Sequence, residues 1–279
     1  MLPELLKIGS FPIRSWGVML ALSFFVGVYY IHLVTRRHNR PFEPYLTTAY
    51  IMIIGGVLGA RLSYVFLHWS EFSGNLLAII NPFQHGQYGI AGLNLYGGLL
   101  GALAGAIVFL RLQKMSILDV FDFFAPTLAI GIGISRIGCF MNGCCFGTPT
   151  DLPWGVVFPA GSLPFYTYGF APLHPAQLYS SAYGFALFVI LHFMLKKRKF
   201  VGQLVAFTFV SEAFFRFVIE FVRYYEQAML FRIGNFQPTY NQVVSLALFI
   251  TGIVLFITQR HKKPSDPIIE SPGETSVAE

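Results

Sequence analysis

The sequence predicts an all-α polytopic membrane protein with about seven transmembrane helices. The 279 residues are 55% hydrophobic and only 11% charged, with a mean hydropathy of +0.61, whereas a soluble domain carries about 25% charged residues. So few charges could not cover a water-facing surface, and most of the surface must therefore face lipid. Seven stretches also approach the roughly 20 apolar residues that a membrane-spanning helix needs. They are 16–35, 47–68, 92–112, 120–142, 175–195, 202–223 and 241–259.

The basic residues between these stretches predict the orientation of the bundle. Most of the 19 lysines and arginines follow the first, third, fifth and seventh stretches. The opposite connections and the N-terminal segment hold only Lys7, Arg14 and Arg232. The positive-inside rule places the richer side in the cytoplasm, with the N-terminus outside and the C-terminus inside. The residues on the richer side are Arg36, Arg37, Arg40, Arg111, Lys114, Lys196, Lys197, Arg198, Lys199, Arg260, Lys262 and Lys263.

The segments outside the hydrophobic stretches differ in composition. Residues 143–174 are rich in Gly, Pro and aromatic residues, which predicts a compact external head segment at the membrane interface. Residues 264–279 are polar and have no periodicity, so we expect a disordered cytoplasmic tail. We then expect residues 1–263 to form a single transmembrane domain. The N-terminus lacks a basic region followed by an apolar run, which predicts that no signal peptide is cleaved.

Glycines recur every four residues on two of the predicted helices. Gly55 and Gly59 do so on the second, and Gly97, Gly101 and Gly105 do so on the third. Small residues at this spacing let helix backbones approach closely in lipid. Helix packing is therefore the favoured interpretation. A phosphate-cradling loop is a weaker one, because no strand precedes the glycines and no Lys-Ser/Thr follows them.

Four arginines lie inside the hydrophobic stretches, where each costs about 2.5–3.5 kcal/mol near the bilayer centre. With a rise of about 1.5 Å per residue, Arg61, Arg136 and Arg216 lie at similar depths, about 10 Å from the outer ends of their helices. Arg223 is close enough to a helix end to reach the interface. Three guanidinium groups at one level favour an anion site for a lipid headgroup, and the alternative is a structural network.

The sixth stretch adds two carboxylates to these arginines. Glu212, Arg216, Glu220 and Arg223 are spaced by four, four and three residues, which puts them on a single helical face. Glu precedes Arg in the favourable order, so we expect Arg216 to be partly paired within its own helix.

Several segments, in this order along nearly the whole chain, resemble the prolipoprotein diacylglyceryl transferase family. They are GARLSY at 59–64, YGGLLGA at 96–102, DFFAP at 122–126, SRIGCFMNGCCFG at 135–147, HPAQLY at 174–179 and FRFVIEFVR at 215–223. The resemblance implies a bacterial enzyme of the cytoplasmic (inner) membrane with its active site in the outer half. Such an enzyme moves diacylglycerol from phosphatidylglycerol to the lipobox cysteine thiol of prolipoprotein signal peptides, forms a thioether and releases glycerol phosphate.

The resemblance also implies roles for individual residues. Arg136 and Arg216 are expected to be the essential arginines on the phosphate side, where a guanidinium stabilises charge on the leaving group. Tyr96 and His174 are the two candidates for the base that removes the thiol proton. The expected substrate-binding residues are Trp16, Arg61, Gly97, Gly98, Asn142, Gly147, Gln177, Tyr179, Glu220 and Arg223.

Three positions depart from the family pattern. Tyr96 replaces a histidine that is the usual candidate base, Trp16 replaces a tyrosine, and Cys139 replaces an asparagine. Tyrosine has an ordinary pKa of about 10 and could serve as base only if nearby arginines depress it. The choice of base therefore stays open.

Three other functions compete with the transferase. The departures favour a divergent paralogue that uses another acceptor or is inactive. A lipid transporter or flippase would show internal repeats, and the sequence has none. A thiol oxidoreductase built on Cys144 and Cys145 is disfavoured because adjacent cysteines are poorly placed for redox cycling; with Cys139 they suggest packing or a structural disulfide. The sequence implies no metal, no organic cofactor and no nucleic-acid partner.

Overall fold

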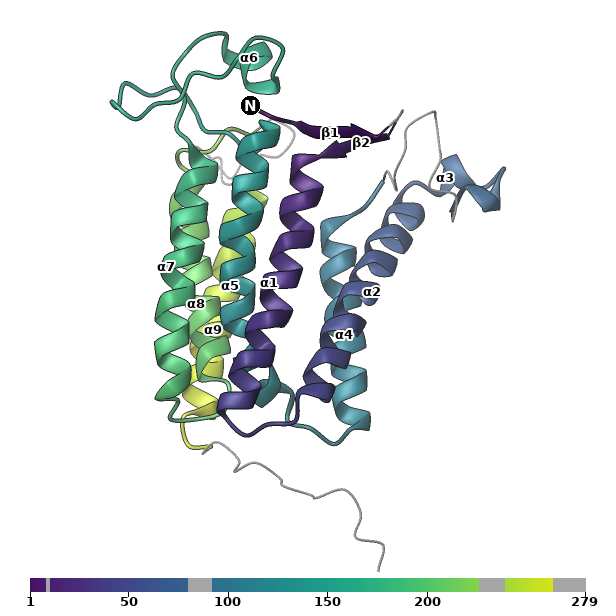
Figure 1. Ribbon diagram of the computed structural model, residues 1–279, viewed down its shortest axis with the longest axis vertical. Coiled ribbons are helices and arrows are strands. Elements are labelled where there is room, and N and C mark those ends of the chain that lie inside the picture. Colours follow the sequence, from purple (N-terminus) through teal and green to yellow (C-terminus); the bar gives the residue numbers. More distant parts are fainter. Residues whose placement is uncertain (9–10, 80–91, 226–238, 263–279) are drawn as a thin grey trace, which may run out of the picture.

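The computed structural model describes residues 1–8, 11–79, 92–225 and 239–262, and Figure 1 shows a bundle of long helices. Six of the described helices are long and apolar enough to cross a membrane. They confirm an all-α polytopic membrane protein. They are α1 (Ser15–Arg37), α2 (Phe42–Leu67), α4 (Leu95–Leu112), α5 (Ile117–Asn142), α7 (Ala176–Lys196) and α9 (Tyr240–Gln259).

The sixth predicted stretch forms a shorter helix than expected. It was predicted over 202–223, but α8 runs from Gln203 to Ile219 and has 17 residues. The chain leaves the helix there because the backbone of 222–224 pairs with the head segment, where Val222 accepts a hydrogen bond from the Thr148 amide at 2.9 Å. The prediction that Arg223 lies on the same helical face as Arg216 is therefore wrong.

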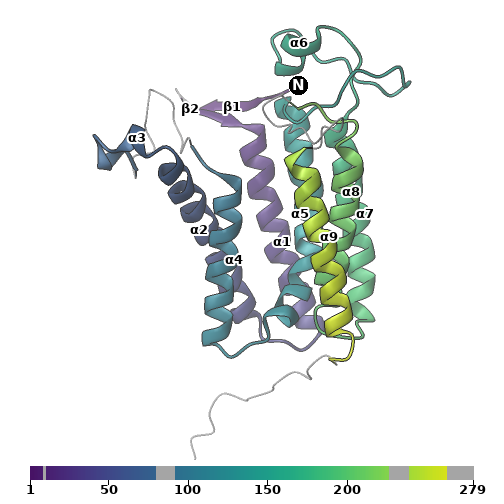
Figure 2. The same ribbon diagram turned by 180° about the vertical axis from the view of Figure 1, so that it is seen from behind.

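Short elements gather at one end of the bundle. The strands β1 (Glu4–Ile8) and β2 (Phe11–Arg14) form an antiparallel hairpin before α1, which the sequence did not predict. Figures 1 and 2 show this hairpin at the same end as α3 (Trp69–Phe72) and the 143–174 segment, which contains α6 (Leu163–Tyr168). The 3₁₀ turn η1 (Leu76–Ile79) follows α3. The predicted tail, 264–279, lies outside the described residues.

The glycine repeats lie where α2 packs against α4, which confirms the packing prediction. A Cβ atom added at Gly55 would lie 2.8 Å from the carbonyl oxygen of Gly101, and one added at Gly59 would lie 2.9 Å from the Gly101 Cα. Gly97 packs on Gly59 and Ser63, and Gly98 packs on Gly56. The two backbones touch, so only glycine fits at these crossings.

The other helices pack around α5, which has α1 on one side and α7 on the other, while α8 pairs with α9 (Figure 2). Gly184 of α7 fits against the backbone of α5, where an added Cβ would lie 2.9 Å from the Ala129 carbonyl oxygen. This close contact fixes α7 against α5 near the middle of both helices.

Buried charges hold the end of the bundle opposite the head segment. Asp122 of α5 is fully buried and accepts hydrogen bonds from the amides of Gly202, Leu204 and Val205 at 2.7–3.0 Å, which caps the start of α8. Arg198 donates to Asp122 at 3.2 Å and to Asp119 at 2.6 Å. Arg40 adds a second ion pair to Asp119 at 3.3 Å. Each carboxylate is matched by cationic or amide donors, so this network closes on itself.

Candidate anion site at the head of the bundle

Three chain segments meet beneath the head through backbone hydrogen bonds. The Gly147 amide donates to the His174 carbonyl at 3.0 Å, and the His174 amide donates to the Thr148 carbonyl at 3.0 Å. On the other side Gly147 bridges to Arg223. A Cβ atom at Gly147 would lie 2.5 Å from the His174 carbonyl oxygen and 2.7 Å from that of Val222. Only glycine fits here, and it ties His174 to the segment that carries Arg223.

Arg136, Arg216 and Arg223 gather near this junction. Arg216 is partly paired, as the sequence predicted; its partner is Glu220, just after the end of α8, at 3.3 Å, and it also donates to the Tyr225 hydroxyl at 3.3 Å. Arg223 lies over the Tyr225 ring at 5.0 Å from its centroid. Arg223 and Arg136 are both close enough to Arg216 to repel its positive charge.

Donors in this arginine cluster lack acceptors. The Nε of Arg223 is buried and has no hydrogen-bond partner. Among the described residues, the Arg136 side chain forms no hydrogen bond and no ion pair, and Arg136 is partly exposed. Three guanidinium groups face the two carboxylates of Glu212 and Glu220, so the cluster is net positive. A buried donor without an acceptor costs about 1–3 kcal/mol, which an incoming anion would recover.

Glu220 connects the end of α8 to the start of α9. It is buried and accepts hydrogen bonds from the Tyr225 hydroxyl at 2.5 Å and from the Thr239 hydroxyl at 2.6 Å. Burial raises the pKa of Tyr225 to about 12, while the charges of Arg223 and Arg216 act in the opposite direction. Tyr225 therefore stays protonated at neutral pH and acts as a donor that positions the Glu220 carboxylate.

A second polar group lies at the start of α7. The Tyr179 hydroxyl accepts a hydrogen bond from Trp154 Nε1 at 2.7 Å and lies 3.3 Å from His174 Nδ1. Gln177 is buried and donates from Nε2 to the Cys144 carbonyl at 2.8 Å, while its Oε1 is buried without a partner. These side chains join the head segment, which includes His174, to the start of α7.

The predicted site residues of α2 and α4 have other contacts. The Arg61 guanidinium donates to the backbone carbonyls of Ala78, Ile79 and Gly92 at 2.8, 2.9 and 3.3 Å. It thereby fastens the loop after α2. Tyr96, half exposed in the first turn of α4, forms no hydrogen bond through its hydroxyl within the described residues.

The other predicted binding residues lie around the end of α5. The backbone of Trp16 packs on Gly138, since a Cβ atom added there would lie 3.2 Å from the Trp16 Cα, and the Trp16 side chain is half exposed. Asn142 is the last residue of α5 and is exposed. Gly97 and Gly98 face α2, as described above, and contribute packing to this end of the bundle.

The three cysteines form a cluster of thiols next to the arginines. The sulfur atoms of Cys139, Cys144 and Cys145 lie within 4.8 Å of one another, and all three are free. Hydrogen bonds from the other two thiols lower the pKa of Cys145, and the charges of Arg223 and Arg136 act in the same direction. Thiols this close could hold a soft metal ion. Their spacing in sequence did not suggest this, because the turn after α5 brings them together. The expectation of no cofactor stays a prediction.

Sequence reasoning missed two residues that position the charged groups. Tyr225 and Thr239 both donate to Glu220. They lie on either side of a long connection, and neither residue is part of a periodic hydrophobic pattern that would have predicted its position. A Thr followed three residues later by Gln242 does signal a capping box, and the structure forms one at the start of α9. That signal places Thr239 at a helix start without revealing its contact to Glu220.

The apolar helices define a multi-pass membrane protein, and a net-positive cluster of arginines lies at one end of its bundle. The family model of prolipoprotein diacylglyceryl transferase matches residues 3–258. The chain belongs to this family, a family of transferases.

Similar proteins extend over nearly the whole chain. Each of three relatives is named phosphatidylglycerol–prolipoprotein diacylglyceryl transferase. That of Bordetella avium is 30% identical over 95% of this chain and 97% of its own length. That of Photobacterium profundum is 31% identical over 94% of each chain. That of Pseudoalteromonas atlantica is 32% identical over 91% of this chain and 88% of its own length.

Proposed function

We propose that this chain transfers the diacylglyceryl group of phosphatidylglycerol to the lipobox cysteine of prolipoprotein signal peptides. One observation carries the proposal in a chain of this family: three arginines meet at the head of the bundle with a buried, unpartnered Arg223 Nε and an unpaired Arg136. A phosphate ester supplies the acceptors that these donors lack, and guanidinium groups bind phosphate in a planar, bidentate way.

The arginines stabilise the leaving group. The cysteine sulfur attacks the diacylglyceryl carbon, the carbon–oxygen bond to the phosphate breaks, and glycerol phosphate leaves with the electron pair. Negative charge builds on the phosphate in this step. Arg136 is held by α5, Arg216 by α8 and its ion pair with Glu220, and Arg223 by the backbone bridge to Gly147, so these residues stabilise that charge without rearranging.

Of the two candidate bases, we propose His174 as the group that takes the thiol proton. Its backbone pairs with Gly147 and Thr148, and Gly147 bridges to Arg223, so His174 is fixed relative to the arginine cluster. Its Nδ1 is oriented by the Tyr179 hydroxyl at 3.3 Å. Tyr96 belongs instead to the α2–α4 pair.

The reaction requires a defined placement in the membrane. We propose that residues 1–263 form one catalytic domain in the bacterial inner membrane, with the hairpin and the 143–174 head segment outside and the C-terminus in the cytoplasm. The charge bias between the two ends of the bundle supports this orientation. The arginine cluster then lies in the outer half of the bilayer, beside the phosphatidylglycerol of the outer leaflet.

A transfer assay tests this function. Purified protein is incubated with phosphatidylglycerol and a lipobox peptide, and the peptide is analysed by mass spectrometry. We expect a diacylglyceryl mass gain on the peptide's cysteine and none on a matched peptide with serine at that position. His174→Gln should lose activity while Tyr96→Phe keeps it; the reverse result would make Tyr96 the base.

A divergent paralogue is the second candidate, favoured by the departures at Trp16, Tyr96 and Cys139. Such a protein would bind phosphatidylglycerol through the same arginines and leave the lipobox peptide unmodified. The wild-type protein in the same assay separates the two, provided that lipid binding is measured in parallel. Binding without transfer would favour the paralogue.

A further inference from the structure

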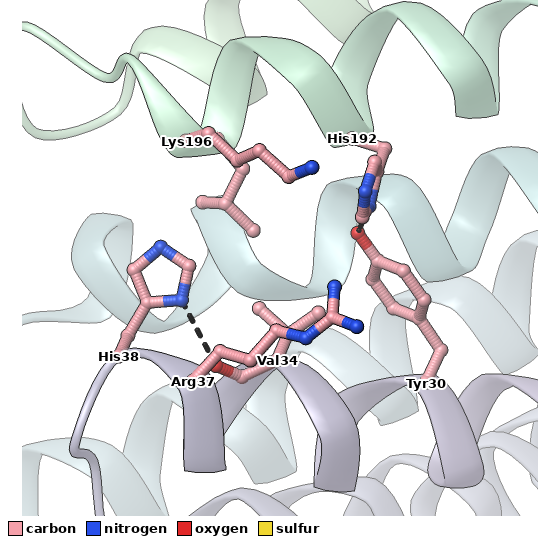
Figure 3. A pocket seen from close by; sticks show the side chains of 7 residues that line it. Tyr30, Val34, Arg37, His38, His192 and Lys196 are labelled. Atoms are coloured by element: carbon pink, nitrogen blue, oxygen red, sulfur yellow. Dashed lines mark hydrogen bonds between the residues drawn. The ribbon is translucent and has the colours of Figure 1, made fainter.

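A pocket of about 260 Å³ lies at the opposite end of the bundle, between the ends of α1 and α7. Figure 3 shows Arg37 from α1 and Lys196 from α7 directed toward the same space, with Tyr30 and His192 meeting at one side. The Tyr30 hydroxyl and His192 Nδ1 are 2.9 Å apart, which joins the two helices across the pocket. This pocket belongs to neither the arginine cluster nor the α2–α4 pair.

The pocket is positively charged and its charge is not neutralised. None of the described residues that line it is acidic. The nearest buried carboxylates along this end of the bundle, Asp119 and Asp122, are already occupied by Arg40, Arg198 and backbone amides. Arg37 forms no hydrogen bond or ion pair with the rest of the described chain. Two permanent cations in one concave space, without a carboxylate, provide binding chemistry for a phosphate group.

Apolar side chains continue from both cations along the bundle surface. On α1, Tyr29 and Leu33 precede Arg37 at intervals of four residues and are 58% and 36% exposed. On α7, Phe193 is 59% exposed and lies under Lys196, whose Nζ is 5.2 Å from the ring centroid. A headgroup held by the cations would therefore place its acyl chains along a surface that already faces lipid.

We propose that this pocket binds the phosphate of an anionic phospholipid in the leaflet at this end of the bundle. In the orientation proposed above, that leaflet is the cytoplasmic one, whose anionic lipids attract basic residues close to the membrane surface. The phosphate accepts from Arg37 and Lys196, and the acyl chains pack beside Leu33 and Phe193. The site is separate from the transfer site and holds its lipid without reacting with it.

Lipid binding to the intact protein in detergent, followed by native mass spectrometry, tests this proposal. The probe is phosphatidylserine, an anionic lipid other than the proposed donor, beside zwitterionic phosphatidylcholine and inorganic phosphate. The variant is Arg37→Gln/Lys196→Gln. Its matched control is Arg36→Gln/Lys197→Gln, which removes the same charge from exposed neighbours outside the pocket. Arg37→Lys/Lys196→Arg keeps both charges and tests for rescue.

We expect the pocket variant to bind phosphatidylserine about tenfold more weakly or worse, while the control and the charge-swapped variant bind as the wild type does. Equal losses in the pocket variant and its control, or no loss in either, would overturn the proposal. If the pocket binds inorganic phosphate but not phosphatidylserine, the proposal that the bound phosphate belongs to a phospholipid is wrong. Transfer activity, measured on the same pocket variant, should remain at the wild-type level. A wild-type protein that transfers nothing would refute the proposed function and leave this result standing.

Discussion

The two ends of the α5–α8 region both concentrate arginines, yet they use them differently. Away from the head, Arg198 and Arg40 meet Asp119 and Asp122, and backbone amides take up the remaining carboxylate oxygens. At the head end, three arginines, Arg136, Arg216 and Arg223, face only two carboxylates of the described chain, Glu212 and Glu220, and the Nε of Arg223 is buried without a partner.

This difference separates charge that stabilises the fold from charge that is available to a ligand. A buried ion pair with every donor and acceptor matched has nothing further to bind, and removing one partner exposes the other to the full desolvation cost. A cluster with unmatched donors is costly in the free protein and gains when an anion arrives. The first arrangement should therefore respond to mutation through stability, and the second through binding and catalysis.

The largest effect is expected for Asp122→Ala. The substitution removes the acceptor for three backbone amides and one bond to Arg198. We expect the free energy of unfolding in detergent to fall by about 3–5 kcal/mol. Asp151→Ala, at an exposed position, is the control and should change it by less than about 0.5 kcal/mol. Comparable stability of the two variants would contradict the structural role of the closed network.

Arg223→Lys tests the open cluster while it keeps the charge. Lysine cannot reproduce the planar guanidinium fork, so we expect kcat/KM for diacylglyceryl transfer to fall by about 10²-fold. Arg111→Lys, at an exposed position on α4, is the matched control. If Arg223→Lys is as active as the wild type, the planar guanidinium group is not needed for phosphate recognition, and a single positive charge at this position is sufficient.

Gly147→Ala tests the junction that aligns His174 with Arg223. The added methyl group would collide with the carbonyls of His174 and Val222 and push the two segments apart. We expect kcat/KM to fall by about 10–100-fold, because small displacements of reacting groups are costly. Gly131→Ala is the control, since an added Cβ there has open space around it. Undiminished activity in Gly147→Ala would show that the junction tolerates separation.

The smallest effect is expected for Tyr225→Phe, which removes one donor to Glu220. We expect a loss of about 1 kcal/mol in the free energy of unfolding at pH 7, measured beside the exposed Tyr166→Phe. The pKa of Tyr225 is raised to about 12, so its stabilising effect is complete below the ordinary value of about 10 and is lost as the pH rises through 12. The difference in the free energy of unfolding between the variant and the wild type should therefore be the same at pH 7 and at pH 9.

The sequence predicted those parts of the protein that depend on local pattern. Hydropathy located the helices, and the spacing of Gly55, Gly59, Gly97 and Gly101 predicted close helix packing, which the structure shows between α2 and α4. The interval of four residues predicted that Arg216 is partly paired with a nearby carboxylate, and the structure pairs it with Glu220. Each of these features is set by neighbours within one or two helical turns.

The sequence could not predict contacts made by distant segments. The helix that carries Arg216 ends at Ile219 because residues near Gly147 pair with Val222, a contact across 74 positions in the chain. Arg61 was expected to join an anion site with Arg136 and Arg216, but it binds carbonyls of the following loop. Asp122 is fully hydrogen-bonded only because backbone amides about 80 residues away in the chain donate to its carboxylate. Depth and periodicity indicate which charges enter the membrane, and only the fold decides which of them find partners.

The most direct test of this account compares Arg136→Gln with Arg198→Gln in one detergent, with unfolding free energy and kcat/KM for transfer measured on both. The account predicts that Arg136→Gln keeps its stability within about 0.5 kcal/mol and loses at least about 10²-fold in kcat/KM. Arg198→Gln should lose about 3 kcal/mol or more while its folded fraction keeps nearly wild-type kcat/KM. If Arg136→Gln unfolds as readily as Arg198→Gln, or if it transfers as well as the wild type, the distinction between the two arginine groups is wrong.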